Sequence, residues 1–96
     1  MLVLVTYDVA TRDPAGARRL ARVARALSDV GVRVQFSVFE CEVDAAQLAT
    51  LRHRLERIID PSVDSIRYYL LGNGGRRRVI HVGAKTSVDV TGTLLI

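Results

Sequence analysis

The sequence predicts one α+β domain, in the order strand, helix, strand region, helix, strand, with one more short strand after them. Three observations support this order: a continuous apolar run at residues 2–7, helical spacing of apolar residues over 14–30 and 45–59, and period-two alternation over 32–43. The 96 residues are enough for one domain. Because so short a chain leaves much of its surface exposed, we expect it to dimerise and so to bury part of that surface.

The first expected strand, residues 2–8, ends in a carboxylate, Asp8. A continuous apolar run is typical of a central strand covered by helices on at least one face, and such strands often present functional groups at their carboxyl ends. Asp is also a favoured turn residue. Asp8 is therefore a candidate site residue, with a plain turn as the alternative.

A helix is expected from Pro14 to about Val30, with Asp13 as its N-terminal cap and Gly31 as a left-handed stop. Basic residues follow its outer side and the loop before it: Arg12, Arg18, Arg19, Arg22 and Arg25. The sequence has 14 basic and 10 acidic residues, and 13 of the basic ones are arginine, whose planar fork suits phosphate oxygens. The stripe predicts phosphate binding, with a solvated helix face as the alternative.

Residues 32–43 alternate with the period of β-structure, and two strands fit there only if the chain bends near Phe36-Ser37, where no Gly, Pro or Asn stands. A capping-box variant at 44–47 then opens a second helix that ends before Pro61. We interpret His53 on that helix as a surface residue.

A strand at 64–71 is followed by the glycine-rich segment 72–75, which supplies a turn or a flexible loop. The basic cluster Arg76, Arg77 and Arg78 then leads into a short strand at 79–82, and it is either a nucleic-acid contact or a charged guard of a sheet edge. The order βαββαβ is that of a ferredoxin-like fold. We expect a domain over 1–83 and a C-terminal tail over 84–96.

Three segments together resemble the CRISPR-associated Cas-two family: Tyr7-Asp8 at the end of the first strand, Gly31-Val32-Arg33-Val34-Gln35-Phe36-Ser37-Val38-Phe39-Glu40-Cys41, and Asp64-Ser65-Ile66-Arg67-Tyr68-Tyr69-Leu70. The resemblance implies a ferredoxin-like homodimer in which the C-terminal strand, here about 79–82, crosses onto the partner's sheet. It also implies partners: the Cas-one integrase of spacer acquisition, double-stranded DNA and, in addition, single-stranded RNA.

The family resemblance further implies a metal-dependent endonuclease acting on RNA or double-stranded DNA. Asp8 would be its catalytic and metal-binding residue, with Mg²⁺ or Mn²⁺ as the cofactor. Two Asp8 carboxylates facing each other across a two-fold axis could share one ion, since magnesium often takes one or two carboxylates plus waters and phosphates. Arg33, Ser37 and Phe39 resemble family residues near that site, although we interpret Phe39 as interface packing.

The alternative function is a non-catalytic DNA-binding scaffold that bridges Cas-one integrase dimers. An RNA-recognition module is set aside, because the aromatic block of that module does not occur. The single cysteine, Cys41, cannot form an intrachain disulfide, and no zinc-like Cys/His spacing is present. Without an apolar run long enough to span a membrane and without a basic leader, we expect no membrane partner and a cytoplasmic location.

Overall fold

The computed structural model describes residues 1–72 and 77–84, which form five strands and two helices. They are, in chain order, β1 (Leu2–Asp8), α1 (Pro14–Ser28), β2 (Gly31–Gln35), β3 (Val38–Glu42), α2 (Ala45–Ile58), β4 (Ser65–Leu71) and β5 (Arg77–Gly83). Neither described helix is long and apolar enough to cross a membrane. The predicted order of elements is confirmed.

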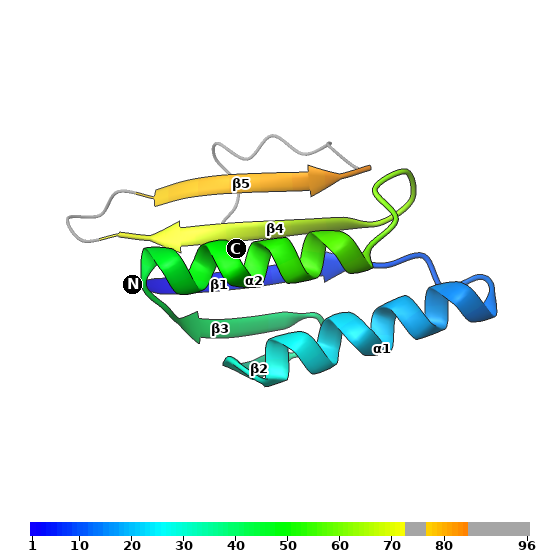
Figure 1. The fold of residues 1–96 in the computed structure, drawn as a ribbon, viewed down its shortest axis with the longest axis horizontal. Coiled ribbons are helices and arrows are strands. Elements are labelled where there is room, and N and C mark those ends of the chain that lie inside the picture. Colours follow the sequence, from blue (N-terminus) through cyan, green and yellow to red (C-terminus); the bar gives the residue numbers. More distant parts are fainter. Residues whose placement is uncertain (73–76, 85–96) are drawn as a thin grey trace.

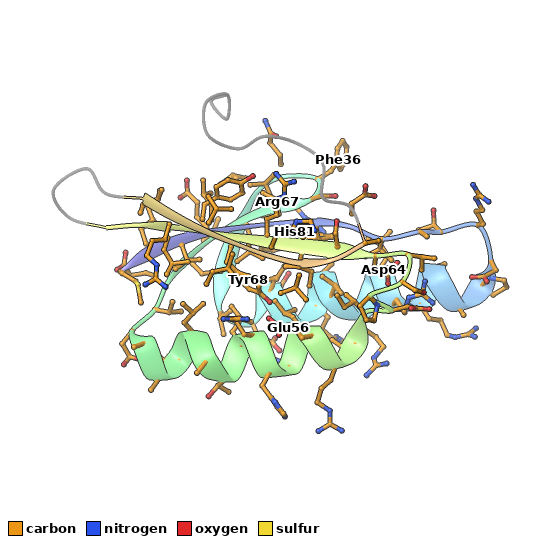
Figure 2. The ribbon with its side chains drawn as sticks, turned by 90° about the horizontal axis from the view of Figure 1, so that it is seen from above. Phe36, Glu56, Asp64, Arg67, Tyr68 and His81 are labelled. Carbon is orange, nitrogen blue, oxygen red and sulfur yellow. The ribbon has the colours of Figure 1, made fainter. Side chains whose placement is uncertain are left out.

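The strands make a single sheet in the order β2-β3-β1-β4-β5, with antiparallel pairing throughout (Figure 1). Both helices lie on one face of this sheet, as the turned view shows (Figure 2). The fold is the ferredoxin-like βαββαβ sandwich with β5 added beside β4. In the part of the chain that the structure describes, both helices therefore cover one face of the sheet and none covers the other.

The core lies between the sheet and the two helices. In β1 the exposure alternates, so that Val3, Val5 and Tyr7 are buried while Asp8, on the opposite phase, is exposed. The inward side chains of α1 and α2 pack on them, among them Leu27 and Leu55, both fully buried. β1 is the central strand, paired with β3 and β4, and Asp8 is its last residue.

Both helix starts follow the caps that the sequence predicts. The Asp13 carboxylate accepts a hydrogen bond from the Gly16 amide at 2.8 Å, ahead of Pro14 in the first turn. At α2, Asp44 and Gln47 exchange two bonds of 2.7 and 2.8 Å, which completes a capping box.

The predicted left-handed role of Gly31 is wrong, because α1 ends at Ser28 and Gly31 begins β2 without a positive φ. A Cβ at this position would meet Cys41 Sγ and the Glu40 carbonyl oxygen, both at 2.6 Å. Glycine is required here for the close approach of β2 to β3, and no left-handed turn is involved.

The bend between β2 and β3 falls at Phe36 and Ser37, as predicted, although neither is a typical turn residue. Tyr7 holds it from the neighbouring strand. Its hydroxyl donates to the Phe36 carbonyl at 3.2 Å, and its amide donates to the Ser37 carbonyl at 3.2 Å. Tertiary hydrogen bonds thus fix a turn that the local sequence does not mark.

The expected crossing of residues 79–82 onto a partner's sheet stays a prediction, because the structure holds one chain. These residues lie within β5, where Val79 pairs with Tyr69 and Val82 with Ile66 of the same chain. An antiparallel neighbour can be reached through a short connection, so β5 follows β4 directly in the sheet. Of the expected tail, residues 85–96 lie outside the described part.

Asp64, just before β4, joins three separate segments through a fully buried carboxylate (Figure 2). The carboxylate accepts bonds from the amides of Ala10 (2.9 Å) and Asp60 (2.8 Å) and from Nε of Arg19 (2.8 Å). Burial alone would raise the pKa of Asp64, but the hydrogen bonds from Arg19 and the two amides outweigh it and hold the pKa below its usual value.

Asp64→Asn should lower the free energy of unfolding at pH 7 by about 3 kcal/mol, because it leaves the buried donors around this position incompletely paired. Chemical denaturation would measure the loss. Since the folded pKa is lowered, the stabilisation is present above the ordinary carboxyl value near 3.8 and is lost as the pH falls below it. The gap between wild type and variant should therefore close in acid.

The control is Asp29→Asn, whose ion pair with Arg54 is exposed and should contribute less than about 1 kcal/mol. Equal losses in the two variants, or a gap for Asp64→Asn that does not narrow as the pH is lowered below 3.8, would contradict this account of Asp64.

Candidate functional site

The carboxylate of Asp8 is exposed at the carboxyl end of β1, opposite Ser65 of β4. Because side chains alternate along a strand, it lies on the phase opposite to Val5 and Tyr7, toward the face without helices. Two residues after it, the Ala10 amide donates a hydrogen bond to the Asp64 carboxylate. The buried carboxylate of Asp64, which is paired with Arg19, therefore fixes the backbone that follows Asp8.

Arg33, Ser37 and Phe39 gather around Tyr7, the residue before Asp8. An Arg33 nitrogen lies 3.5 Å from the Tyr7 hydroxyl, the Ser37 carbonyl accepts from the Tyr7 amide at 3.2 Å, and the Phe39 ring lies 6.2 Å from the Tyr7 ring. The Arg33 guanidinium also covers the Phe39 ring at 5.1 Å.

The interpretation of Phe39 as interface packing is wrong for the single chain, because the side chain is only 1% exposed within its own core. Phe39 pairs with Val5, one of the buried positions of β1, and so points to the helix-covered side. Its contacts with Tyr7 and Arg33 support the end of β1 on the helix-covered side of the sheet.

Within residues 1–72 and 77–84, no three His, Cys, Asp or Glu side chains group so that they could hold a metal ion. The exposed carboxylate that the described residues place at the carboxyl end of β1 is that of Asp8. A hard cation that keeps several waters can bind through one or two carboxylates together with substrate phosphates. Asp8 fits such a partial site, and the remaining oxygen ligands would have to come from outside the described chain.

Four of the predicted phosphate-binding arginines are exposed: Arg12 in the loop before α1, and Arg18, Arg22 and Arg25 on the helix. Arg19 does not belong with them. Its Nε binds the buried Asp64 carboxylate, and its side chain is 19% exposed. No local feature of the sequence indicates this pair, because the two residues are 45 positions apart.

The basic cluster before the last strand is described in part. Arg76 lies outside the described residues, whereas the backbones of Arg77 and Arg78 belong to β5, opposite Leu71 and Leu70. Arg78 is exposed. Its position on the edge strand is compatible with both interpretations of the cluster: contact with a nucleic acid, or charged residues that keep the sheet edge from pairing with another strand.

Two buried groups sit apart from this site and offer no accessible nucleophile. Burial raises the pKa of the Cys41 thiol, which is fully buried. Burial also raises the pKa of Tyr68, and the nearby Glu56 adds to the effect; its hydroxyl lies between the sheet and α2 without a hydrogen bond (Figure 2). Both groups are therefore part of the core.

The family model "CRISPR associated protein Cas2" matches residues 1–79, which include β1, Asp8 and the first residues of β5. The chain belongs to the Cas2 family. The resemblance of the three sequence segments is thereby confirmed.

Curated Cas2 relatives are similar over nearly the whole chain. The "CRISPR-associated endoribonuclease Cas2 3" of Rhodospirillum rubrum is 58% identical, covering 99% of this chain and 100% of the relative. The "CRISPR-associated endonuclease Cas2" of Halalkalibacterium halodurans is 50% identical, covering 99% of both chains. The crystal structure of Streptococcus pyogenes Cas2 at pH 6.5 matches with a TM-score of 0.71 and 57% identity, over 77% of this chain and 89% of that one.

Replacing Arg18, Arg22 and Arg25 together with alanine should weaken binding of duplex DNA about equally for unrelated sequences. Each lost phosphate contact should flatten the log-log dependence of affinity on salt by about one unit. Fluorescence anisotropy over a salt series would measure both effects. Unchanged binding would mean that this face of α1 is only solvated.

Proposed function

We propose that this Cas2 chain is a metal-dependent endonuclease of CRISPR spacer acquisition that cleaves RNA or double-stranded DNA as a homodimer. The observation that carries the proposal is the exposed carboxylate of Asp8 at the carboxyl end of β1, on the sheet face that no helix covers. The names of the relatives, endoribonuclease and endonuclease, support a phosphodiester substrate.

In this proposal Asp8 supplies one anionic oxygen ligand, and the Asp8 of a second copy supplies another across a two-fold axis. A bound Mg²⁺ or Mn²⁺ would contribute activation of water and stabilisation of the leaving oxygen. The chain's own part is positional. The Asp64 pair fixes the backbone after Asp8, and Tyr7 ties the strand's end to the β2–β3 turn.

The second candidate is a non-catalytic scaffold that holds double-stranded DNA between Cas-one integrase dimers. It is favoured by the exposed arginines Arg18, Arg22 and Arg25, which belong to α1 on the helical side of the sheet. Binding there needs no metal and no Asp8. The two functions are compatible, because they use different faces of the molecule.

Asp8→Asn tests the enzyme directly, since the amide keeps the size of the side chain but removes a hard anionic ligand. Wild-type cleavage should require Mg²⁺ or Mn²⁺, and the variant should lose more than about 100-fold in rate, because even residues that only orient metal ligands cost 10- to 100-fold. Duplex affinity should stay within about twofold of wild type, since the arginines supply it.

The matched control is Glu42→Gln, which removes one carboxylate whose side chain is 77% exposed, at the other end of the sheet pairing with β1. It should cleave like the wild type. If the wild-type protein shows no cleavage with either metal while Asp8→Asn still supports spacer capture with the Cas-one integrase, the scaffold is the function and the enzyme proposal fails.

A further inference from the structure

A groove of about 500 Å³ lies between α1 and α2. Arg22 and Arg25 of α1 line one wall, and residues of α2 line the other: His53, Arg54, Arg57 and Ile58. Four of the six lining side chains are therefore guanidinium groups. Only the packing of the two helices brings these residues of α2 opposite Arg22 and Arg25.

The positive charge of this groove is only partly balanced. Arg54 makes an ion pair of 3.0 Å with Asp29, but both side chains are about half exposed, so the pair is easily exchanged for another anion. Among the described residues, no carboxylate lies within ion-pair distance of Arg22, Arg25 or Arg57. Like charges held in one concavity repel each other unless an anion joins them.

We infer that this groove binds the phosphodiester backbone of a nucleic acid. Guanidinium forks from two walls can each donate to phosphate oxygens, and they match that geometry better than point charges would. No Phe, Tyr or Trp lines the groove, and its one aromatic ring is the imidazole of His53, so the groove contacts nucleic acid mainly through charge. Binding there is therefore sequence-independent and strongly dependent on salt.

The inference rests on the proposed nucleic-acid function and extends it to α2, which the sequence did not implicate. It also assigns the groove a role. The groove belongs to the helical layer, whereas Asp8 is on the opposite phase from the helix-facing residues of β1. A strand held in the groove is thus separated by the sheet from the Asp8 of the same chain, so the groove retains nucleic acid and does not present it for cleavage.

The test is the double variant Arg54→Gln/Arg57→Gln, with a labelled 30-nucleotide DNA duplex and a single-stranded RNA as probes in fluorescence anisotropy. Loss of two phosphate contacts should weaken binding roughly tenfold or more near 0.1 M salt and should flatten the salt slope by about 1.4 to 1.8 units. Arg54→Lys/Arg57→Lys should recover most of the affinity, because lysine keeps the charge without the fork.

The control for net charge is Ala45→Glu/Ala49→Glu, which lowers the charge by the same two units at exposed positions of α2 that do not line the groove. It should weaken binding much less. Equal weakening in the two double variants would overturn the inference, because only overall charge would matter. Unchanged binding in Arg54→Gln/Arg57→Gln would overturn it as well.

Asp29→Asn provides a test by gain of affinity, which loss of folding cannot imitate. Removing the acid that competes for Arg54 should tighten binding of both probes severalfold and steepen the salt slope by up to about one unit. Glu42→Gln raises the charge by the same unit away from the groove and should change affinity much less. No gain in Asp29→Asn beyond that control would count against the groove.

Failure of the groove and failure of the nuclease give different results. If the groove variants lose affinity but cleave at the wild-type rate under saturating nucleic acid, both proposals stand. If the wild type does not cleave while the groove variants still lose affinity, the nuclease fails and the groove stands. If Asp8→Asn abolishes cleavage and the groove variants bind like the wild type, the groove fails alone.

Discussion

The carboxylate of Asp64 is the constraint on which the site depends. It is fully buried, yet Arg19 and the amides of Ala10 and Asp60 satisfy it, so that the loop after β1, the first turns of α1 and the approach to β4 are held at one point. The carbonyl of Asp64 also accepts from the Ala84 amide at 2.9 Å, just beyond Gly83. Gly83 has a positive φ, and a Cβ there would collide with that carbonyl, so β5 can end at this point only with glycine.

The sequence predicted the features whose causes are local. The caps at Asp13 and Asp44, the buried run of β1 and the element order follow from propensities and periodicities that act over a few residues. The exposure of Asp8 at a strand end follows from the same alternation. The β2–β3 bend was predicted only because the element order requires two strands there, and the bonds from Tyr7 explain why no turn residue is needed.

What the sequence could not predict depends on contacts between distant positions. In the sequence Arg19 resembles the other arginines of α1. Only the fold shows that its guanidinium forms an ion pair with a carboxylate 45 residues away. Phe39 is buried in the core because it pairs with Val5, one of the buried residues of β1. The spacing of residues in the sequence does not reveal this pairing. The role of Gly31 was missed for the same reason, since the space for its Cβ is occupied by Cys41 and Glu40 of the adjacent strand.

The distribution of charge argues that binding and cleavage have different requirements for assembly. Arg22 and Arg25 of α1 and Arg54 and Arg57 of α2 line a common groove within one chain, so phosphate binding there would need no second copy. In the proposed enzyme, the ion at Asp8 would take its second carboxylate from the Asp8 of another copy, because the described part of the chain brings no group of three metal-ligating side chains together. Binding should therefore follow the concentration of single chains, whereas cleavage should follow that of dimers. We therefore expect a range of protein concentration in which the protein binds nucleic acid but does not yet cleave it.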